Sequence, residues 1–541
     1  MATSSHDSIL LATRPGGSGP PAPAPSPAPA PALPPISRKK QAAVLFSAFM
    51  TTALTIGYNQ SFGVFQQYYL SPSQDVLIPS PASQVSPPPT ALLAFVGTLC
   101  YGLTWAGGIV VNPVIARLEH GSWASATSST RLWRRRLLRL LTPRVITVSG
   151  VLVTSAGFVL ASLSRSVWQL LITQGFLAGM GMSLLYFPLL APAPEYFTNH
   201  RATALGFILA GGGAGGLVLS PVIRALLSSI GGRWTLRLYA LFNLLAGLPI
   251  AWTVPRSRFA VGRNTAAVST PGHRLSESPE RREEEEEGQQ QRGFGTHVSR
   301  ALASRPTFLL SAAAAFLQAA GAQLPIAFIP SYTAALGLGG DGGGSGGGGE
   351  EEGASTMGAT LLAASSAVNA ASRVVAGYAG DRLGRQNALV LTLLLAAGSV
   401  YAFWLTSALL AVEEWGGGAS SSLSSSSAAA WSSSAWSLWL AFVALYSFSV
   451  GGYYALFPAL VADVFGIRHY AAVNAFILFV RGLGTLFGSP VGGQLLGSAA
   501  EGARAYTSVA CWDGALLTAA TLCCVGVRWA DAKGKGWRWI A

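Results

Sequence analysis

The sequence predicts an all-α membrane protein with twelve transmembrane helices in two six-helix bundles and both termini in the cytosol. Half of the 541 residues are hydrophobic and only 11% are charged, which is more apolar material than a soluble core needs. Stretches of about 20 apolar residues, the length of a bilayer-spanning helix, recur along the chain. The Lys and Arg residues gather in alternate loops, and this pattern sets the orientation.

Twelve apolar spans follow one another, separated by short polar or Gly/Pro-rich breaks. They are expected at 42–69, 90–112, 145–163, 167–191, 202–228, 235–254, 306–334, 356–379, 387–411, 436–460, 470–496 and 506–528. The fifth contains GGGAGG (211–216) followed by Ser220-Pro221. These small residues suit movable helices whose backbones approach closely, and packing alone is the alternative explanation.

The spans divide into an N-terminal bundle at 41–254 and a C-terminal bundle at 305–530. The polar segment 255–304 between them is predicted to be a flexible cytosolic linker. Residues 1–40 form a Pro/Ala-rich tail that is predicted to be disordered and cytosolic, and 531–541 form a second cytosolic tail. Two such bundles predict a central path with a substrate site near the bilayer midplane, and alternating access by rocking.

The net charge of +13 is distributed as a membrane orientation requires, which argues against a nucleic-acid partner. The basic residues of one side are Arg38, Lys39, Lys40, Arg117, Arg131, Arg134, Arg135, Arg136, Arg139, Arg144, Arg382, Arg385, Lys533, Lys535 and Arg538. The opposite loops at 70–89, 338–355 and 412–435 contain neither Lys nor Arg. The positive-inside rule therefore places both termini and the linker in the cytosol.

The basic insertion 118–143 separates spans two and three. Its stretch RLWRRRLLRLL (131–141) interleaves Trp and Leu with Arg, as suits a short helix lying on an anionic inner leaflet. Charge that only orients the protein is the alternative interpretation.

We expect no enzyme activity, no cofactor and no metal site. The four cysteines, Cys100, Cys511, Cys523 and Cys524, fall in or beside predicted spans without metal-ligand spacing, so they are interpreted as small apolar residues. The spans offer no nucleophile-base pair or metal-ligand cluster.

The run Gly377-Tyr378-Ala379-Gly380-Asp381-Arg382-Leu383-Gly384-Arg385 matches the loop signature G-x-x-x-D-R-x-G-R and resembles that of the major facilitator superfamily. The resemblance implies the two-bundle fold and a charge latch at the cytosolic gate. In such a latch Asp381 accepts hydrogen bonds from helix N-termini or arginines, and Gly377, Arg382, Gly384 and Arg385 complete the motif. The corresponding loop of the first half, after Asn112-Pro113, is degenerate.

Three further stretches are similar to the monocarboxylate-transporter family, particularly its fungal members. They are SFGVFQQYY (61–69), YFTNHRATALGFILAGGGAGG (196–216) and NAASRVVAG (369–377), supported by FPALVADVFG (457–466) and GSPVGGQL (488–495). The chain departs from the animal members at two places that handle protons. Gln60 stands where they have a lysine and Asn369 where they have an aspartate, and their first-span Asp-Gly-Gly-Trp-Gly-Trp-like motif is absent.

A permanent positive charge, Arg373, lies inside the eighth span. It is eight residues from Asp381, or roughly 12 Å along a helix, which is too deep for snorkelling alone. Asn369 and Arg373 share one helix face as an i, i+4 pair. Because arginine keeps its proton and its planar fork suits a carboxylate, Arg373 is predicted to bind an anionic substrate.

A second central arginine, Arg481, lies in the eleventh span on one stripe with Asn474 and Thr485. Neither arginine has an acidic partner at matching depth. Glu195 and Asp463 lie near cytosolic span ends, and Asp513 lies near the outer end of span twelve. The alternative is that either arginine is structural, hydrogen-bonded to helix carbonyls or reaching Asp463.

Other side chains are candidates for the walls and polar contacts of such a site. They are Tyr58, Asn59, Gln60, Phe65, Tyr186, Gln318, Gln323, Tyr453 and Tyr454. Packing or the membrane-interface belt is the alternative role for each. The resemblance favours only the first-span group, in which Tyr58, Asn59 and Gln60 would contact substrate.

We therefore expect a secondary active or facilitative transporter of a small organic anion, with a monocarboxylate as the expected substrate. Glu195 is the candidate for proton coupling, if a proton is a second partner. The alternatives are an exporter of drugs or secondary metabolites with the same fold, and a non-transporting sensor or scaffold. One chain is expected to suffice in the lipid bilayer, in the plasma membrane or in a vacuolar or other internal membrane.

Overall fold

The computed structural model describes residues 37–71, 74–77, 90–119, 142–197, 200–255, 298–336, 349–416, 425–496 and 499–535, which are almost entirely helical. Most of the expected tail 1–40, linker 255–304 and basic insertion 118–143, and part of the tail 531–541, lie outside these residues. Below, residues 37–255 are called the N-terminal half and residues 298–535 the C-terminal half.

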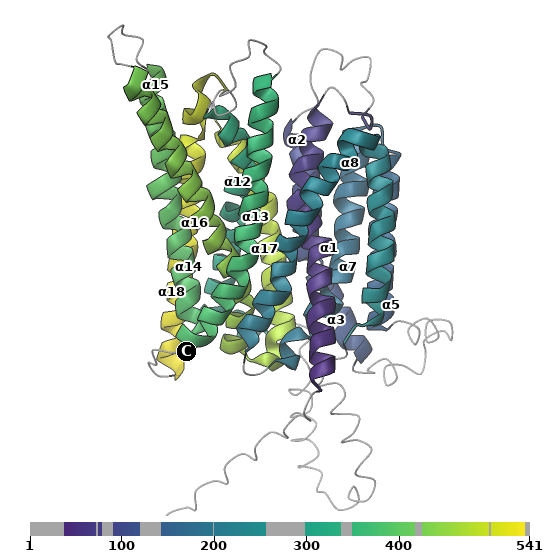
Figure 1. Cartoon of the computed structure of the whole chain (residues 1–541). Helices are drawn as coiled ribbons and strands as arrows, with labels where there is room; N and C mark the ends of the chain where they lie inside the picture. Colours follow the sequence, from purple (N-terminus) through teal and green to yellow (C-terminus); the bar gives the residue numbers. More distant parts are fainter. Residues whose placement is uncertain are drawn as a thin grey trace, which may run out of the picture. The chain divides into compact units, whose positions relative to one another are not determined.

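The described part of the N-terminal half is almost entirely helical (Figure 1). Its helices are α1 (Arg38–Leu70), α2 (Thr90–Ala106), α3 (Gly108–Glu119), α5 (Pro143–Ser162), α6 (Val167–Leu170), the π-helix η2 (Leu171–Leu177), α7 (Ala178–Leu190), the 3-10 helix η3 (Ala193–Tyr196) and α8 (Arg201–Trp252).

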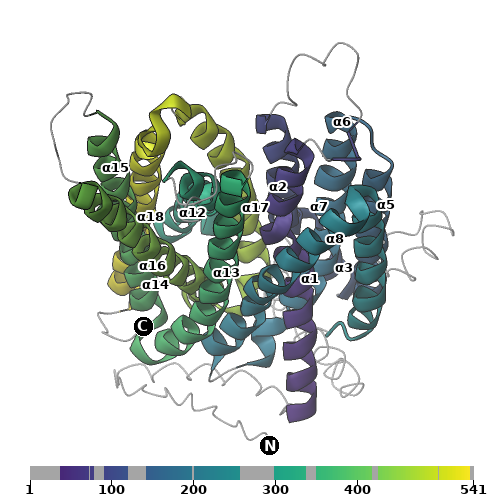
Figure 2. The same cartoon turned by 45° about the horizontal axis from the view of Figure 1, so that its top comes forward.

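The C-terminal half has the same organisation, and Figure 2 shows its helices packed side by side. They are α11 (Arg300–Ala303), α12 (Pro306–Ala335), α13 (Gly349–Leu383), α14 (Arg385–Ser399), the π-helix η4 (Val400–Leu405), α15 (Thr406–Gly416), α16 (Ser425–Phe465), α17 (Ile467–Leu495), the 3-10 helix η5 (Ala499–Tyr506) and α18 (Thr507–Lys535).

Within the described residues, ten helices are long and apolar enough to span a membrane. One of them, α8, covers two of the expected spans, 202–228 and 235–254. Helix α13 is not among the ten, and it carries the buried polar side chains of Asn369, Ser372 and Arg373 in its middle. These findings account for the expected spans and establish an all-α membrane protein.

Helix α8 is broken rather than continuous. Gly231 has φ 77° and ψ 172°, a backbone conformation that is essentially restricted to glycine. The carboxylate of Asp75 accepts hydrogen bonds from the amides of Gly232 at 2.8 Å and Arg233 at 3.3 Å, so it caps the second arm. The two expected spans thus meet at one residue, with no separate loop between them.

The buried apolar side chains fall into clusters that follow the two halves. The largest lies almost wholly in the C-terminal half and contains the stacked rings of Trp404, Trp439 and Phe442. Two others lie almost wholly in the N-terminal half. Each half therefore has a core of its own, as rigid bodies that move against one another would need.

The halves meet along α8 and α13, where glycines bring the backbones into contact. A Cβ atom at Gly206 would collide with the carbonyl of Arg373, and one at Gly213 would lie 2.8 Å from the Cβ of Ala370. Only residues without side chains allow this approach. The close-packing role of the run 211–216 is therefore seen in the structure.

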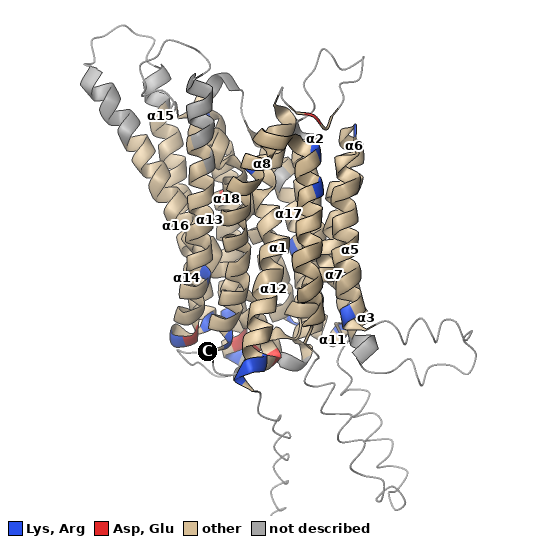
Figure 3. Cartoon of the chain, turned by 45° about the vertical axis from the view of Figure 1, so that its right-hand side comes forward, with Lys and Arg blue, Asp and Glu red and all other residues tan. Residues whose placement is uncertain are grey.

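Charged residues gather at one end of the helices (Figure 3). We call this the charged end and define it by Arg201, Asp381, Arg385 and Asp463. At the opposite end lie fewer charges, among them Arg165 after α5 and Arg233 after the break in α8.

Candidate functional site

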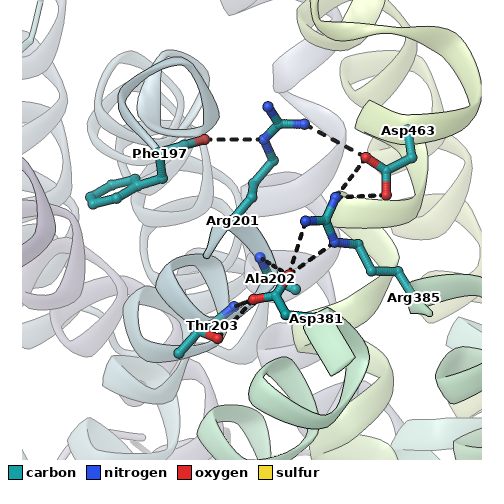
Figure 4. A network of polar contacts seen from close by, with 7 residues as sticks. All are labelled: Phe197, Arg201, Ala202, Thr203, Asp381, Arg385 and Asp463. Carbon is teal, nitrogen blue, oxygen red and sulfur yellow. Dashed lines mark hydrogen bonds and ion pairs between the residues drawn. The ribbon is translucent and has the colours of Figure 1, made fainter. Parts of the chain in front are cut away.

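A carboxylate of the C-terminal half caps a helix of the N-terminal half at the charged end (Figure 4). Asp381, near the end of α13, accepts hydrogen bonds from the amides of Ala202 at 3.3 Å and Thr203 at 2.9 Å, and from the Thr203 hydroxyl at 2.8 Å. The first amides of a helix have no partner within the helix and favour a negative charge. The acceptor geometry expected of the latch is therefore present, while its gating role stays a prediction.

Arg385 connects this cap to a second acid (Figure 4). Its guanidinium lies 2.9 Å from Asp381 Oδ1 and donates to both oxygens of Asp463 at 2.7 Å. Asp463 also lies 3.6 Å from Arg201 Nη1, an ion pair that joins the two halves. The ion pairs Arg201–Asp463, Arg385–Asp381 and Arg385–Asp463 thus form one network.

Asp381 lies beyond the expected span 356–379, and its surroundings favour the charged form. Burial raises its pKa, but the hydrogen bonds from Thr203 and the pairing with Arg385 outweigh burial, so the pKa of Asp381 lies below its usual range. The latch therefore stays charged at neutral pH.

The remaining residues of the motif have separate roles. A Cβ at Gly377 would lie 2.6 Å from the Ala202 carbonyl, so glycine permits the contact between the halves. Gly384 has φ 92° and is the N-cap residue of α14. Arg382 is exposed, with its guanidinium carbon 5.3 Å from the ring of Tyr378. Of the two motif arginines, Arg385 joins the network and Arg382 does not.

A cavity of about 650 Å³, counting the part open to solvent, lies between the halves. Its walls are Ile56, Tyr101, Trp105, Tyr186, Phe187, Leu190, Ala191, Leu205 and Leu209 from the N-terminal half, with Arg373, Tyr454, Phe457, Pro458, Tyr470, Asn474, Leu478 and Arg481 from the other. The two expected arginines are the cationic residues of this lining, and most of the rest is apolar or aromatic.

Arg373 enters the cavity from α13 and is 1% exposed. Its Nη1 donates to the Leu209 carbonyl, and its Nη2 donates at 3.3 Å to Gln60, whose amide in turn donates to the Gly212 carbonyl at 3.2 Å. The neighbouring donors and acceptors fix this orientation of the Gln60 amide. The Nε of Arg373 has no acceptor among the described residues. Arg373 is thus partly bound by a carbonyl, as its structural alternative predicts, yet keeps hydrogen-bonding capacity.

Arg481 reaches the same cavity from α17 and is 3% exposed. Its guanidinium carbon lies 4.5 Å from the ring centre of Tyr454, 5.2 Å from that of Trp105 and 5.7 Å from that of Tyr453. Its Nε makes no hydrogen bond within the described residues. The centre of the Tyr454 ring also lies 4.9 Å from the guanidinium carbon of Arg373, so this one ring makes cation–π contacts with both arginines.

Other predicted contacts lie away from this lining. Asn369 is 4% exposed and donates to the Ser447 carbonyl at 3.2 Å. The hydroxyl of Tyr58 accepts from Gln174 at 2.7 Å within the N-terminal core. Asn59 donates to the carbonyl one turn before it, that of Thr55, at 2.9 Å.

Glu195, the predicted coupling residue, lies in η3 at the charged end and is 8% exposed. It is not among the residues that line the cavity. Arg373 and Arg481 therefore share the cavity, Gln60 contacts Arg373 from outside the lining, and Glu195 lies outside this group.

Five aromatic residues of the lining were not predicted from the sequence, and two of them lie on α2. Tyr101 and Trp105 of α2 both line the cavity, and Trp105 stacks on Arg481. Their i, i+4 spacing places them on one face, which is the signal that could have indicated them. That spacing alone does not distinguish a cavity wall from a packed core.

Comparisons with known proteins agree with this architecture. Residues 129–421 match the model of the Major Facilitator Superfamily. An MFS-type transporter of Gibberella moniliformis is 26% identical over 398 residues, which cover 73% of this chain and 78% of the relative. MFS-type transporter 1 of an Ophiocordyceps species is 22% identical over 88% of this chain and 82% of its own length.

A third relative, the Agnestins efflux protein AgnL12 of Paecilomyces divaricatus, is 27% identical over 207 residues, which cover 38% of this chain and 40% of the relative. The family model covers more than half of the chain, and the helical architecture described above agrees with it. The chain belongs to the major facilitator superfamily and is a multi-pass membrane transporter.

Proposed function

We propose that this transporter carries a small organic anion, with a monocarboxylate as the first substrate class, by alternating access. The observation that carries the proposal is the pair Arg373 and Arg481. Both face one cavity between the halves, and neither forms an ion pair with a described carboxylate.

The cost of burying these charges supports an anion as the missing partner. A charged side chain at a helix centre costs about 2.5–3.5 kcal/mol even on the lenient insertion scale. Arginine cannot lower this cost by losing its proton. A carboxylate would accept hydrogen bonds from the guanidinium groups and compensate both charges, and a bidentate contact suits its geometry.

The walls of the cavity indicate that the anion carries an apolar or aromatic part. Tyr101, Trp105 and Tyr186 line the N-terminal side, and Phe457 lines the other. A cavity with mostly apolar walls and a few convergent polar groups is typical of small-molecule sites.

The latch and the cavity together support alternating access. Asp381 and Arg201 make contacts between the halves at the charged end, and Arg373 lies two helical turns deeper on α13. In the proposed cycle these contacts break when the site opens towards that end, which the positive-inside rule assigns to the cytosol.

Export of a secondary metabolite is the second candidate. One partial relative is an efflux protein by name, and the mostly apolar and aromatic lining of the cavity suits the apolar part of such a cargo. Both candidates require an anionic group on the cargo, so the same arginines serve either.

The test is uptake of radiolabelled nicotinate and nicotinamide into proteoliposomes, with pyruvate, benzoate and succinate as further probes and protein-free liposomes subtracted. Nicotinate and nicotinamide share a ring and differ in charge. We expect saturable uptake of nicotinate or another monocarboxylate. Arg373→Gln should lower it about tenfold or more, because it removes charge-assisted hydrogen bonds worth roughly 1.5–3 kcal/mol.

Arg300→Gln is the matched control, since Arg300 is an exposed residue of α11. It should leave uptake unchanged. Equal uptake of nicotinamide, or full activity in Arg373→Gln, would contradict the anion site. Saturable uptake of succinate alone would mean that each arginine takes one carboxylate.

A further inference from the structure

Asp513 is a buried acid that the latch and the arginine cavity do not use. It lies in the second turn of α18 and is 0% exposed. Neither of its carboxylate oxygens has a hydrogen-bond partner among the described residues. The sequence suggests a position near the outer end of span twelve, yet Asp513 packs against Gly321, the middle of α12.

The surroundings of Asp513 are polar but contain, among the described residues, no cation that pairs with it. A Cβ at Gly321 would lie 2.7 Å from Asp513 Oδ1, so glycine makes room for the carboxylate. Gln318, one turn away on the same face of α12, is 0% exposed and has neither amide atom hydrogen-bonded. The Tyr446 hydroxyl of α16 interacts electrostatically with Asp513 and also has no hydrogen-bond partner among the described residues.

The other titratable groups of the elements packed against α18 have different neighbours. Tyr401 of η4 lies beside Gly514, and Tyr506 of η5 makes an edge-to-face contact with Tyr332 of α12. Arg481 of α17 faces Tyr453 and Tyr454, and Tyr470 of α17 lines the cavity. Arg504 of η5 is exposed. Four further groups lie towards the charged end: Arg385 of α14, His469 at the start of α17, and Arg528 and Asp531 of α18.

An ionised carboxylate in this place would be a buried charge without a donor. Such a charge is far more costly than the neutral acid, and ionisable residues inside a membrane span mark ion or proton pathways by default. Asp513 therefore suits a group that holds a proton while it is sealed from water and releases it when the packing around it opens.

A line of tyrosines connects Asp513 to the arginine cavity. Tyr446 and Tyr454 lie eight residues apart on α16, and therefore on one face, and they interact electrostatically. The hydroxyl of Tyr454 accepts from Gln323 of α12 at 3.3 Å, and its ring serves both arginines. These side chains are the physical connection through which the proposal below couples the two sites.

We propose that Asp513 is the proton-binding site that couples transport to a proton gradient. The inference rests on the proposed anion transport. A proton from water on one side forms an O–H bond with the carboxylate, is carried while the site is closed, and is released to water on the other side. Asp513 then takes the role expected of Glu195. The two positions that handle protons in the animal members of the family carry uncharged residues in this chain, Gln60 and Asn369.

The cargo of this site is a proton rather than a metal cation. Sodium or calcium needs several oxygen ligands, calcium six to eight of them. Asp513 is accompanied only by the amide of Gln318 and the hydroxyl of Tyr446 among the groups described above. The described residues contain no group of three or more His, Cys, Asp or Glu that could hold a metal.

The experiment compares gradient-driven accumulation with exchange in the same proteoliposomes, using nicotinate, or the panel anion that moves fastest. In wild type, an imposed proton gradient should raise accumulation above the level without a gradient. Asp513→Asn should lose this increase and keep gradient-free exchange within about twofold, because the cavity is unchanged. Asp531→Asn, an acid on the same helix that accepts from Gln386 at 2.8 Å, and Glu195→Gln should keep the increase.

A second readout does not depend on transport. Infrared difference spectra between high and low pH should contain the carbonyl stretch of a buried carboxylic acid in wild type and in Asp531→Asn, and lack it in Asp513→Asn. If no panel anion exchanges, the proposed function fails while this band still tests the proton site.

Several results would overturn the proton site. They are full gradient-driven accumulation in Asp513→Asn, loss of the increase in Glu195→Gln alone, accumulation driven by a sodium gradient instead, gradient-independent accumulation in wild type, and an infrared band unchanged by Asp513→Asn.

Discussion

Helix α8 begins twice, at Arg201 and again after Gly231, and each beginning is capped by a carboxylate from another segment. Asp381 caps the first arm from the opposite half, through Ala202 and Thr203. Asp75 caps the second arm from within the same half. Both use the free amides and the positive end of a helix.

The two caps differ in what holds them. Asp381 has a side chain only 6% exposed and pairs with Arg385, so its charge is fixed within an ion network. Asp75 is exposed and accepts a further hydrogen bond from the Tyr68 hydroxyl at 2.9 Å. The same interaction can therefore hold one half together or join the two halves, depending on which segment supplies the acid.

The strongest test of this difference is Asp381→Ala. Losing a charged acceptor for helix amides costs about 1.5–3 kcal/mol, which corresponds to roughly a 10- to 100-fold change in the equilibrium between closed and open states. We expect transport to fall about tenfold or more, while the melting temperature of the purified protein changes little. Uptake assays and thermal unfolding in detergent measure the two effects separately.

Arg382→Ala is the control from the same motif. Arg382 is exposed and makes no ion pair within the described network, so its loss should change transport less than twofold. Equal losses in the two variants would mean that the motif acts through general charge rather than through the cap.

The second test is Gly231→Ala at the break in α8. The backbone conformation of Gly231 costs about 1–3 kcal/mol for other residues, and the new Cβ would lie 2.8 Å from Asp75 Oδ2. We expect a lower melting temperature and less folded protein, with transport per folded molecule unchanged. A selective loss of transport without loss of stability would show that the break itself moves during the cycle.

The smallest effect is expected for Asp75→Ala. Removing a helix cap costs about 1 kcal/mol of stability, and the cap lies within one half. The melting temperature should decrease by less than in Gly231→Ala, and the uptake rate should stay within twofold. A tenfold loss of uptake would place Asp75 in a second gate and would remove the distinction between the caps.

The sequence predicted the helical membrane fold because span length and hydropathy depend on local composition. It also identified Arg373 and the motif Asp381 to Arg385, since charge in an apolar span and a dense motif are visible without packing. The contribution of Trp105 was not predictable, because an aromatic residue on an apolar helix looks the same in a core and in a cavity wall.

The sequence also did not predict hydrogen-bond partners that lie on helices distant in the chain. Asn369 shares a helix face with Arg373 yet bonds to Ser447 of α16, which spacing along one helix cannot reveal. The lack of a donor for Asp513 likewise depends on three helices that are distant in sequence. The two spans expected at 202–228 and 235–254 meet at the break at Gly231. There the carboxylate of Asp75, in the segment after α1, accepts a hydrogen bond from the amide of Gly232.

The glycine contact between α8 and α13 has a consequence for the rate of the proposed cycle. Where Gly206 and Gly213 meet α13, neither residue has a side chain that could interdigitate with that helix. A rotation there requires few rotamer changes, so little activation energy is spent on repacking. The barrier is then determined mainly by the contacts that must break at the charged end, and the turnover rate should be adjustable through Asp381 and Arg201 without redesign of the interface.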